Sequence, residues 1–299
     1  MFDLRYHVAS LAAVFFALII GILVGVALAS HGLGDSERDR LQADLRRAEA
    51  QSDGLQSQVD ALEDNGASNA AFVDKTYKVV MADRLKGARI SVLFVGSVDN
   101  AFHSQITTAL EDAGGEELRF RVLKVPVNEP ALAQELRRGR PFLQAYAGPT
   151  RLDDLGQALG QEFVAGVDTP LWNALERLIV ELRGGPLERP ADGVIVVRNV
   201  AAQTGPSARF LKGIYQGLKD VGVPVVGVDV TAGDGTAITA FKKAHLSTVD
   251  DVDLPTGKLA LVILLRDPAV PGNFGAKNPP SEDGRLPNVP TLPTTTTGG

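Results

Sequence analysis

The sequence of 299 residues contains no cysteine, and this absence excludes several kinds of chemistry. Without a thiol, the chain forms no disulfide, zinc–thiolate site or iron–sulfur cluster and has no cysteine nucleophile. Methionine is scarce as well, with two residues, so we do not expect one chain to build a soft copper(I) site from sulfur ligands. The missing cysteine fits an exported protein but does not decide the redox compartment.

An excess of basic residues is also missing. The chain has 30 Lys and Arg residues against 36 Asp and Glu residues, which gives a net charge of −6. Because binding to a phosphate backbone requires a basic surface, we do not expect a nucleic-acid partner.

Catalytic signatures are missing too, including GxGxxG, the P-loop, GxSxG and HExxH. The loop after the first predicted strand, residues 96–99 (GSVD), has a single glycine. The four histidines are scattered along the chain: His7, His31, His103 and His245. We therefore expect a protein that is not an enzyme and has no bound cofactor.

A long apolar run begins the chain. Val8 to Ala29 is 22 residues without a charge, which corresponds to about 33 Å of helix and is enough to cross a ~30 Å hydrocarbon layer. The apolar part of a cleavable signal peptide is about 7–15 residues, so residues 1–31 favour an uncleaved signal-anchor over cleavage after Ala27-Leu28-Ala29. The charges that flank the run are nearly balanced. The short N-terminal flank favours an exported body.

Small residues recur at every fourth position of this segment: Ala9, Ala13, Ala17, Gly21, Gly25 and Ala29. Small side chains let two helices approach closely in lipid, so Ala17, Gly21 and Gly25 predict a face for self-association. The alternative is that alanine and glycine are simply common in membrane helices.

A short coiled coil is predicted over residues 35–65. Its apolar seam has alternating steps of four and three residues: Leu41, Leu45, Ala48, Ser52, Leu55, Val59 and Leu62. The alternative is a single amphipathic helix that packs on the exported domain. Asn65-Gly66 predicts the end of this helix, and a second helix is expected over residues 68–85.

Residues 68–275 read as one α/β domain. Five predicted strands cover residues 89–95, 118–127, 193–197, 224–230 and 258–265, and helical patterns separate them: 99–110, 130–138, 151–163, 170–182, 206–221 and 237–244. This alternation predicts a mostly parallel sheet of the Rossmann-like or flavodoxin-like kind. The tail, residues 276–299, is rich in Pro and Thr and is predicted to be disordered.

One acidic motif is dense enough to consider as a metal site. Three carboxylates fall within four residues: Asp250, Asp251 and Asp253. Such oxygen ligands suit a hard cation, and Asp229 and Asp234 could join them in space. The alternative is a solvated turn before the last predicted strand. His31 copies that meet in an oligomer are a second, weaker candidate site.

Four segments together resemble a known family. Residues 5–15 (RYHVASLAAVF), with Gly21 and Gly25 behind them, are similar to the N-terminal signature of the mycobacterial copper transport protein B (MctB) family. Residues 246–253 (LSTVDDVD), the predicted strand up to Leu265 and residues 271–275 (PGNFG) are similar to its C-terminal signature. The resemblance covers residues 1 to about 275.

The resemblance implies an actinobacterial-type envelope protein that acts in copper efflux or copper homeostasis, with a location in the outer membrane. A copper ion is implied by the resemblance alone. The competing interpretation is an oligomeric scaffold or sensor whose α/β domain binds a protein partner. A third is a membrane-tethered enzyme or nucleotide binder, for which the sequence offers no motif.

Overall fold

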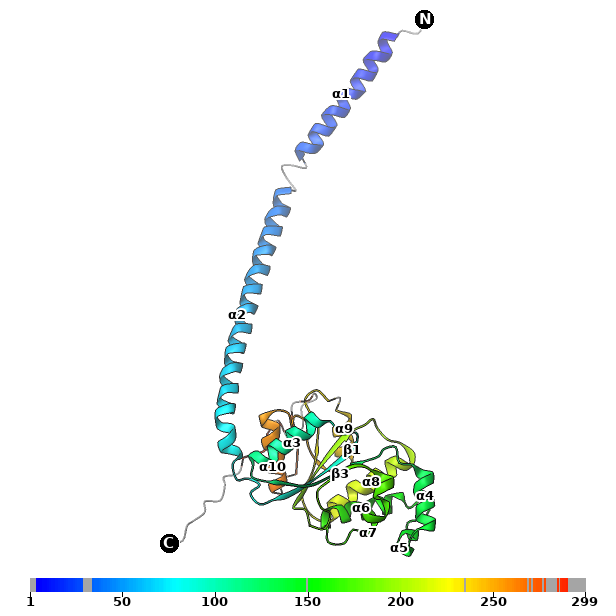
Figure 1. Ribbon diagram of the computed structural model, residues 1–299. Coiled ribbons are helices and arrows are strands. Elements are labelled where there is room, and N and C mark those ends of the chain that lie inside the picture. Colours follow the sequence, from blue (N-terminus) through cyan, green and yellow to red (C-terminus); the bar gives the residue numbers. More distant parts are fainter. Residues whose placement is uncertain are drawn as a thin grey trace, which may run out of the picture. The chain divides into compact units, whose positions relative to one another are not determined.

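The computed structural model describes residues 4–28, 34–148, 150–233, 235–267, 269, 271–275, 277, 284 and 286–289 (Figure 1). The chain forms two compact units, residues 1–72 and 73–299. Four predictions fall wholly or mostly outside the described residues: the cleavage site at Ala29, the sites at His31 and Asp234, and the tail 276–299.

Helix α1 (Leu4–Leu28) contains the apolar run, and helix α2 (Gly34–Met81) follows it. The predicted break at Asn65-Gly66 is wrong, because α2 continues through both residues as one helix of 48 residues. A single glycine lowers helix stability by about 1 kcal/mol relative to alanine, which a long helix tolerates. The end of α2, from Val73 onward, belongs to the second unit, where Met81 is buried in the core and Tyr77 and Val80 pack against it.

In the part of the chain that the structure describes, seven strands form one sheet: β1 (Arg89–Gly96), β2 (Glu116–Leu123), β3 (Val180–Gly184), β4 (Gly193–Asn199), β5 (Val225–Val228), β6 (Ser247–Val249) and β7 (Asn273–Phe274). Their order is β3-β2-β1-β4-β5-β6-β7, and every neighbouring pair is parallel except β2 and β3. The predicted α/β class is therefore confirmed. The first six strands have the Rossmann order, in which the direction of strand addition reverses between β1 and β4.

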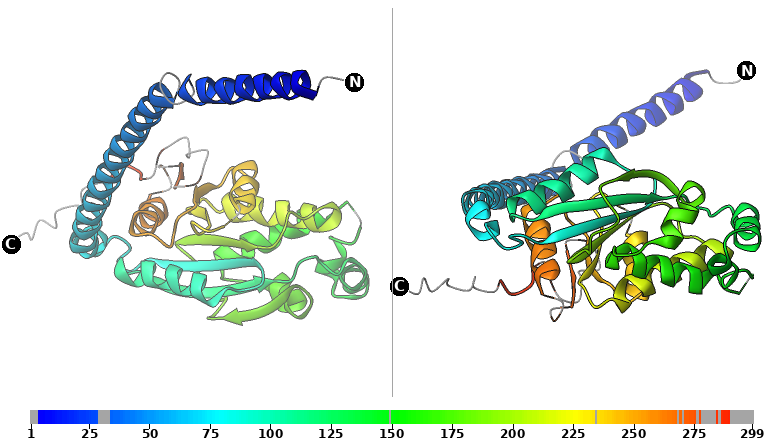
Figure 2. Two further views of the ribbon diagram at one scale, coloured as in Figure 1. Left: turned by 90° about the horizontal axis from the view of Figure 1, so that it is seen from above. Right: turned by 60° about the horizontal axis from the view of Figure 1, so that its bottom comes forward.

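Helices cover both faces of the sheet (Figure 2). Among the described residues, one face carries α4 (Glu129–Arg138), α5 (Pro141–Gln144), α6 (Leu152–Ala165), α7 (Pro170–Ile179), α8 (Gly205–Asp220) and α9 (Thr236–Lys243). The other face carries α3 (Asn100–Asp112), α10 (Pro255–Arg266) and the end of α2. Alternate residues of one strand enter the two cores, as Leu93 and Phe94 do, so the central strands are apolar on both sides.

The predicted strand at residues 258–265 is wrong, because this segment is helix α10. The seven consecutive residues Leu259–Leu265 are all buried, as is Gly257, which leaves the helix without a polar stripe. A continuous apolar run cannot separate a buried helix from a buried strand. Pro255 in the first turn is the signal that favours a helix, since proline is well tolerated there.

Three short strands were not predicted. Strand β3 occupies the end of the segment 170–182 that the sequence predicts as helical, and α7 stops at Ile179. Strands β6 and β7 have three and two residues, and such short segments show no recognisable alternation of apolar and polar residues. The second predicted strand, in turn, ends at Leu123 rather than at residue 127.

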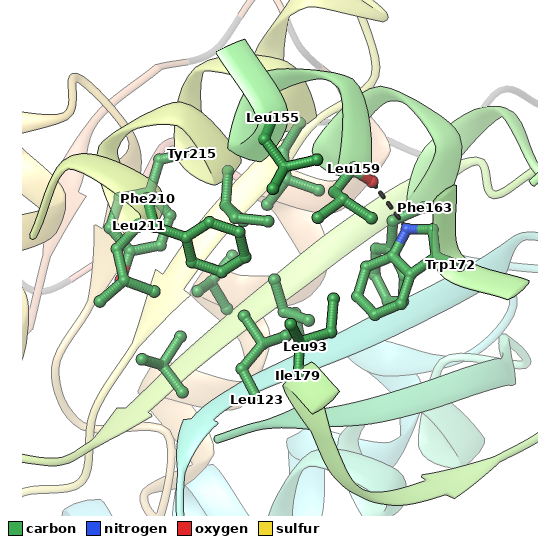
Figure 3. Packing of buried hydrophobic residues seen from close by; sticks show 14 of the residues in the cluster. Leu93, Leu123, Leu155, Leu159, Phe163, Trp172, Ile179, Phe210, Leu211 and Tyr215 are labelled. Carbon is green, nitrogen blue, oxygen red and sulfur yellow. Dashed lines mark hydrogen bonds between the residues drawn. The ribbon is translucent and has the colours of Figure 1, made fainter. Parts of the chain in front are cut away.

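Helices α6 and α8 approach each other through glycines. A Cβ atom added at Gly156 or Gly160 of α6, or at Gly213 or Gly217 of α8, would lie 1.9–2.5 Å from a backbone oxygen of the opposite helix. Only glycine fits such a contact. Below this pair, Leu155 and Leu159 point toward Leu93 of the sheet, and Trp172 donates a 2.8 Å hydrogen bond from Nε1 to the Leu159 oxygen (Figure 3).

Candidate functional site

The acidic motif lies at the carboxyl edge of the sheet, beside the ends of β5 and β6. These strands pair in parallel with Val228 opposite Val249, so the residues that follow them come together. Asp229 follows β5, and Asp250 and Asp251 follow β6. All three residues are buried, with Asp251 at 0% exposure. Buried carboxylates require compensating partners, because burial disfavours the charged form.

A lysine from beyond β7 supplies part of that compensation. The Nζ atom of Lys277 forms an ion pair with Oδ2 of Asp229, and its backbone N–H donates to Oδ1 of Asp250 at 3.2 Å. Lys277 therefore connects the two acidic loops. The sequence interpretation missed this residue, because a single lysine in a proline-rich tail carries no pattern.

Asp253 is directed elsewhere. Its Oδ1 atom accepts hydrogen bonds from the backbone N–H of Thr231 at 2.8 Å and from the Thr231 hydroxyl at 3.0 Å. This contact joins the loop after β6 to the loop after β5. Asp253 is thus used as a loop bridge, and the predicted set of three clustered carboxylates separates into two kinds of contact.

The two parts of the C-terminal signature form this edge together. Strands β6 and β7 pair with Thr248 opposite Asn273, and the Thr248 hydroxyl donates a 2.8 Å hydrogen bond to Oδ1 of Asn273. Behind them, a Cβ atom added at Gly275 would lie 1.9 Å from Oδ1 of Asp250. Glycine at position 275, with φ of +150°, therefore leaves the space that the Asp250 carboxylate fills.

The described residues contain no group of three or more His, Cys, Asp or Glu side chains that could hold a metal ion. Asp229, Asp250 and Asp251 follow neighbouring strands at one edge without forming such a group, and carboxylate oxygens suit a hard cation better than copper(I). Of the two methionines, Met81 is buried in the core at the end of α2. The candidate residues thus lie where loops of a parallel sheet converge, with Lys277 already bound there.

The second candidate feature is the anchor. Within the described part of the chain, Ser10–Ala27 is the one helical segment that is long and apolar enough to cross a membrane, and none of it is buried. Ala17, Gly21 and Gly25 are spaced by four and lie on one face of α1. A Cβ atom added at Gly21 or Gly25 would meet nothing within 4 Å.

The leucine seam of α2 is exposed. Leu41 and Leu62 show 72% and 70% of their surface, and Leu45 and Leu55 are more than half exposed. Large apolar side chains at heptad spacing on one helix are typical of a surface that another helix covers.

Comparison with known proteins supports the resemblance. The family described as "Copper transport outer membrane protein, MctB" matches residues 1–281, which include α1, α2 and the acidic edge. The proteins named "Copper transporter MctB" from Mycobacterium bovis and from two strains of Mycobacterium tuberculosis are each 26% identical to the chain over 305 residues. The aligned region covers 92% of this chain and 95% of each relative. The chain therefore belongs to the MctB family and is a copper-related protein of the cell envelope.

Proposed function

We propose that the chain is a single-pass membrane protein that acts in copper efflux or copper homeostasis, with its α/β domain exported. The observation that carries the anchoring is the segment Ser10–Ala27, which is apolar, helical and without buried residues. Exposing that much apolar surface to water is unfavourable by about 25 cal/mol per Å², whereas lipid covers it. The family and the names of its relatives support the link to copper.

Self-association is part of the proposal. The small residues of α1 let two membrane helices pack closely, and the leucines of α2 can form a parallel coiled coil behind them. Each contact is weak alone, but tethering makes the second contact intramolecular, so the two reinforce each other. Copper is the cargo in this proposal. No catalytic step and no resident cofactor are assigned.

A growth experiment tests this function. A strain that lacks the gene is complemented with the full chain or with a chain that lacks residues 1–33, both at equal abundance. We expect the full chain alone to restore growth in copper, because the truncated domain cannot be held at the membrane. Restoration by the truncated chain would contradict the anchored function.

The proposed topology has its own measurement. Protease added to intact cells should cut the α/β domain if it is exported, and density fractionation of the envelope assigns the anchor to the inner or the outer membrane. A domain that is cut only after the cells are lysed would contradict export.

A second candidate function is an oligomeric envelope scaffold or sensor whose α/β domain binds a protein partner. It is favoured because the described residues hold no group of three metal-binding side chains and the acidic edge already binds Lys277. The two functions differ in cellular copper content. A deletion strain with unchanged copper content and unchanged copper sensitivity would favour the scaffold over transport.

A further inference from the structure

A cavity of about 310 Å³ lies between α8 and α9, on the face of the sheet away from α3 and α10. Its polar lining comes from the end of β4, the loop after it and the two helices: Arg198, Gln203, Lys212, Tyr215 and Lys243. Alanine and leucine side chains of α8, of α9 and of the residue that follows α9 make the rest of the wall. We call this the basic cavity.

The basic cavity carries positive charge that no described carboxylate in its lining balances. Three cationic side chains line it, and none of the described lining residues is an Asp or a Glu. Within the described part of the chain, Arg198, Lys212 and Lys243 take part in no ion pair, whereas Arg89, Arg121 and Lys277 do. Cations gathered at a concave surface attract an anion from solution.

Two donors of residues that line the cavity have no acceptor among the described residues. Nε of Arg198 donates to the Val200 oxygen at 3.0 Å, but its Nη2 atom is buried and none of the described residues accepts from it. Tyr215 is 5% exposed, and its hydroxyl is also buried with no hydrogen-bond partner among the described residues. Buried polar groups are almost always hydrogen-bonded, so these two donors of cavity-lining residues are available to an acceptor from outside the chain, a water molecule or a ligand.

The Tyr215 hydroxyl is able to serve as a donor. Burial raises the pKa of Tyr215, and the nearby Arg198 lowers it by less, so the phenol stays protonated at neutral pH. Its ring is fixed by an edge contact with Phe241 of α9, with 5.8 Å between ring centroids. The hydroxyl is therefore held in place rather than free to turn to solvent.

We propose that the basic cavity binds a small organic phosphate, with Arg198 and the Tyr215 hydroxyl bound to the phosphate oxygens. Lys212 and Lys243 are exposed and complete the charge at the rim. A phosphate group carries about −1.5 to −2 charges and three acceptor oxygens, which matches several cations and two open donors better than a single carboxylate does. The alanine and leucine wall accommodates an apolar or ring portion of the ligand.

Calorimetric titration of the full chain in detergent tests this proposal at low salt. The probes are phenyl phosphate, inorganic phosphate, benzoate and phenol. We expect phenyl phosphate to bind most tightly, inorganic phosphate and benzoate to bind more weakly, and phenol not to bind. Benzoate binding as tight as that of phenyl phosphate would overturn the phosphate assignment, and no heat with phenyl phosphate would overturn the site.

Variants distinguish a specific binding site from non-specific electrostatic attraction of the anion. Arg198→Gln should weaken phenyl phosphate binding on the order of tenfold or more, because a charge-assisted hydrogen bond is lost. Tyr215→Phe should also weaken it, yet should leave the melting temperature of the ligand-free chain unlowered, because the hydroxyl has no protein partner to lose. A lowered melting temperature would show that the hydroxyl is already satisfied and would overturn its role.

Lys243→Gln has a matched control in Lys242→Gln. Both changes remove one positive charge from α9, but Lys242 does not line the basic cavity. We expect the first change to weaken binding and the second to have little effect. Equal losses would show that phenyl phosphate responds only to net charge and would overturn the proposed site.

Discussion

Single glycines set how closely α6 and α8 approach. A Cβ atom at Gly217 would lie 1.9 Å from the Gln157 oxygen, and both atoms belong to helix backbones that cannot move independently. Gly217→Ala should therefore force the helices apart and lower the free energy of unfolding by about 1–3 kcal/mol, the usual range for overpacking. Urea denaturation of the full chain in detergent measures this loss.

Gly66→Ala is the control for this substitution. Gly66 lies inside α2, and an added Cβ atom meets nothing within 4 Å, so alanine brings only its better helix propensity, about 1 kcal/mol. We expect the domain's denaturation midpoint to stay unchanged. Equal losses in the two variants would refute the close-approach argument.

At the same scale, the acidic edge could be found from the sequence but its contacts could not. Three carboxylates in four residues mark Asp250, Asp251 and Asp253 as unusual in any sequence. Their partners come from distant positions: Lys277 is 48 residues from Asp229, and Thr231 is 22 residues from Asp253. Pairings over such separations depend on strand order, which no local pattern encodes.

At the scale of elements, one helix begins with a cap from another. Helix α7 has Thr169 before it, yet the Thr169 side chain makes no capping hydrogen bond. Glu162 of α6 accepts from the backbone N–H groups of Leu171 at 3.0 Å and Trp172 at 3.1 Å instead. A carboxylate at a helix N-terminus satisfies open donors and complements the helix dipole.

Replacing Glu162 should separate hydrogen bonding from charge. Glu162→Ala removes the acceptor and should lower the free energy of unfolding by about 1–2 kcal/mol, as loss of a helix cap does. Glu162→Gln keeps an acceptor and should cost much less. Thermal denaturation of both variants at neutral pH makes the comparison, and equal losses would contradict the capping role.

The difference in stability between wild type and Glu162→Gln should depend on pH, because it follows from the pKa of the Glu162 carboxyl. Burial raises this pKa, and the hydrogen bonds from Leu171 and Trp172 lower it by less. The pKa of Glu162 is thus higher in the folded protein than in the unfolded chain. Its contribution to the free energy of unfolding is therefore fully present below the unfolded pKa, and it is lost as the pH rises through the folded pKa. Wild type should therefore lose stability relative to Glu162→Gln as the pH rises from about 4. If wild type instead gains stability relative to Glu162→Gln as the pH rises, the hydrogen bonds rather than burial determine the pKa of Glu162.

Amphipathic helices were predictable from the sequence, and fully buried or very short elements were not. The segments of α3, α6 and α8 each show an apolar stripe, and the sequence places them correctly. Helix α10 lacks a stripe because it is buried on all sides, so it reads as a strand. Strand β3 depends on pairing with β2 rather than on its own residues, of which three of five are exposed.

For the whole molecule, alternation of helices and strands was sufficient to predict the α/β class, but not the strand order or the antiparallel edge. The apolar run and the heptad seam were visible as local patterns. Whether they associate is a property of two chains, and it is tested by cross-linking. The absence of cysteine makes every introduced thiol a unique probe.

We expect a parallel homo-oligomer, most simply a dimer. Cysteine at Leu45 or Leu55 should form disulfide dimers in membranes, because equivalent seam positions face each other in a parallel coiled coil. Gly21→Ile or Leu55→Asp should each lower the dimer fraction, and the double change should abolish it.

A cysteine at Arg46 is the matched control, since it lies next to the seam but points away from it, and it should cross-link poorly. Seam cysteines that fail to cross-link while the protein stays folded would contradict the coiled coil. If Leu55→Asp instead destabilises the α/β domain and leaves dimers through α1 intact, the seam packs on its own domain.

The ion pair between Lys277 and Asp229 also has a consequence for truncation. The two residues are 48 positions apart, and strand β7 (Asn273–Phe274) lies just before Lys277. A chain that stopped before residue 273 would lack both the strand beside β6 and the cation beside Asp229. Because a buried carboxylate without a partner is costly, such a truncation should destabilise the acidic edge although β5 and β6 remain intact.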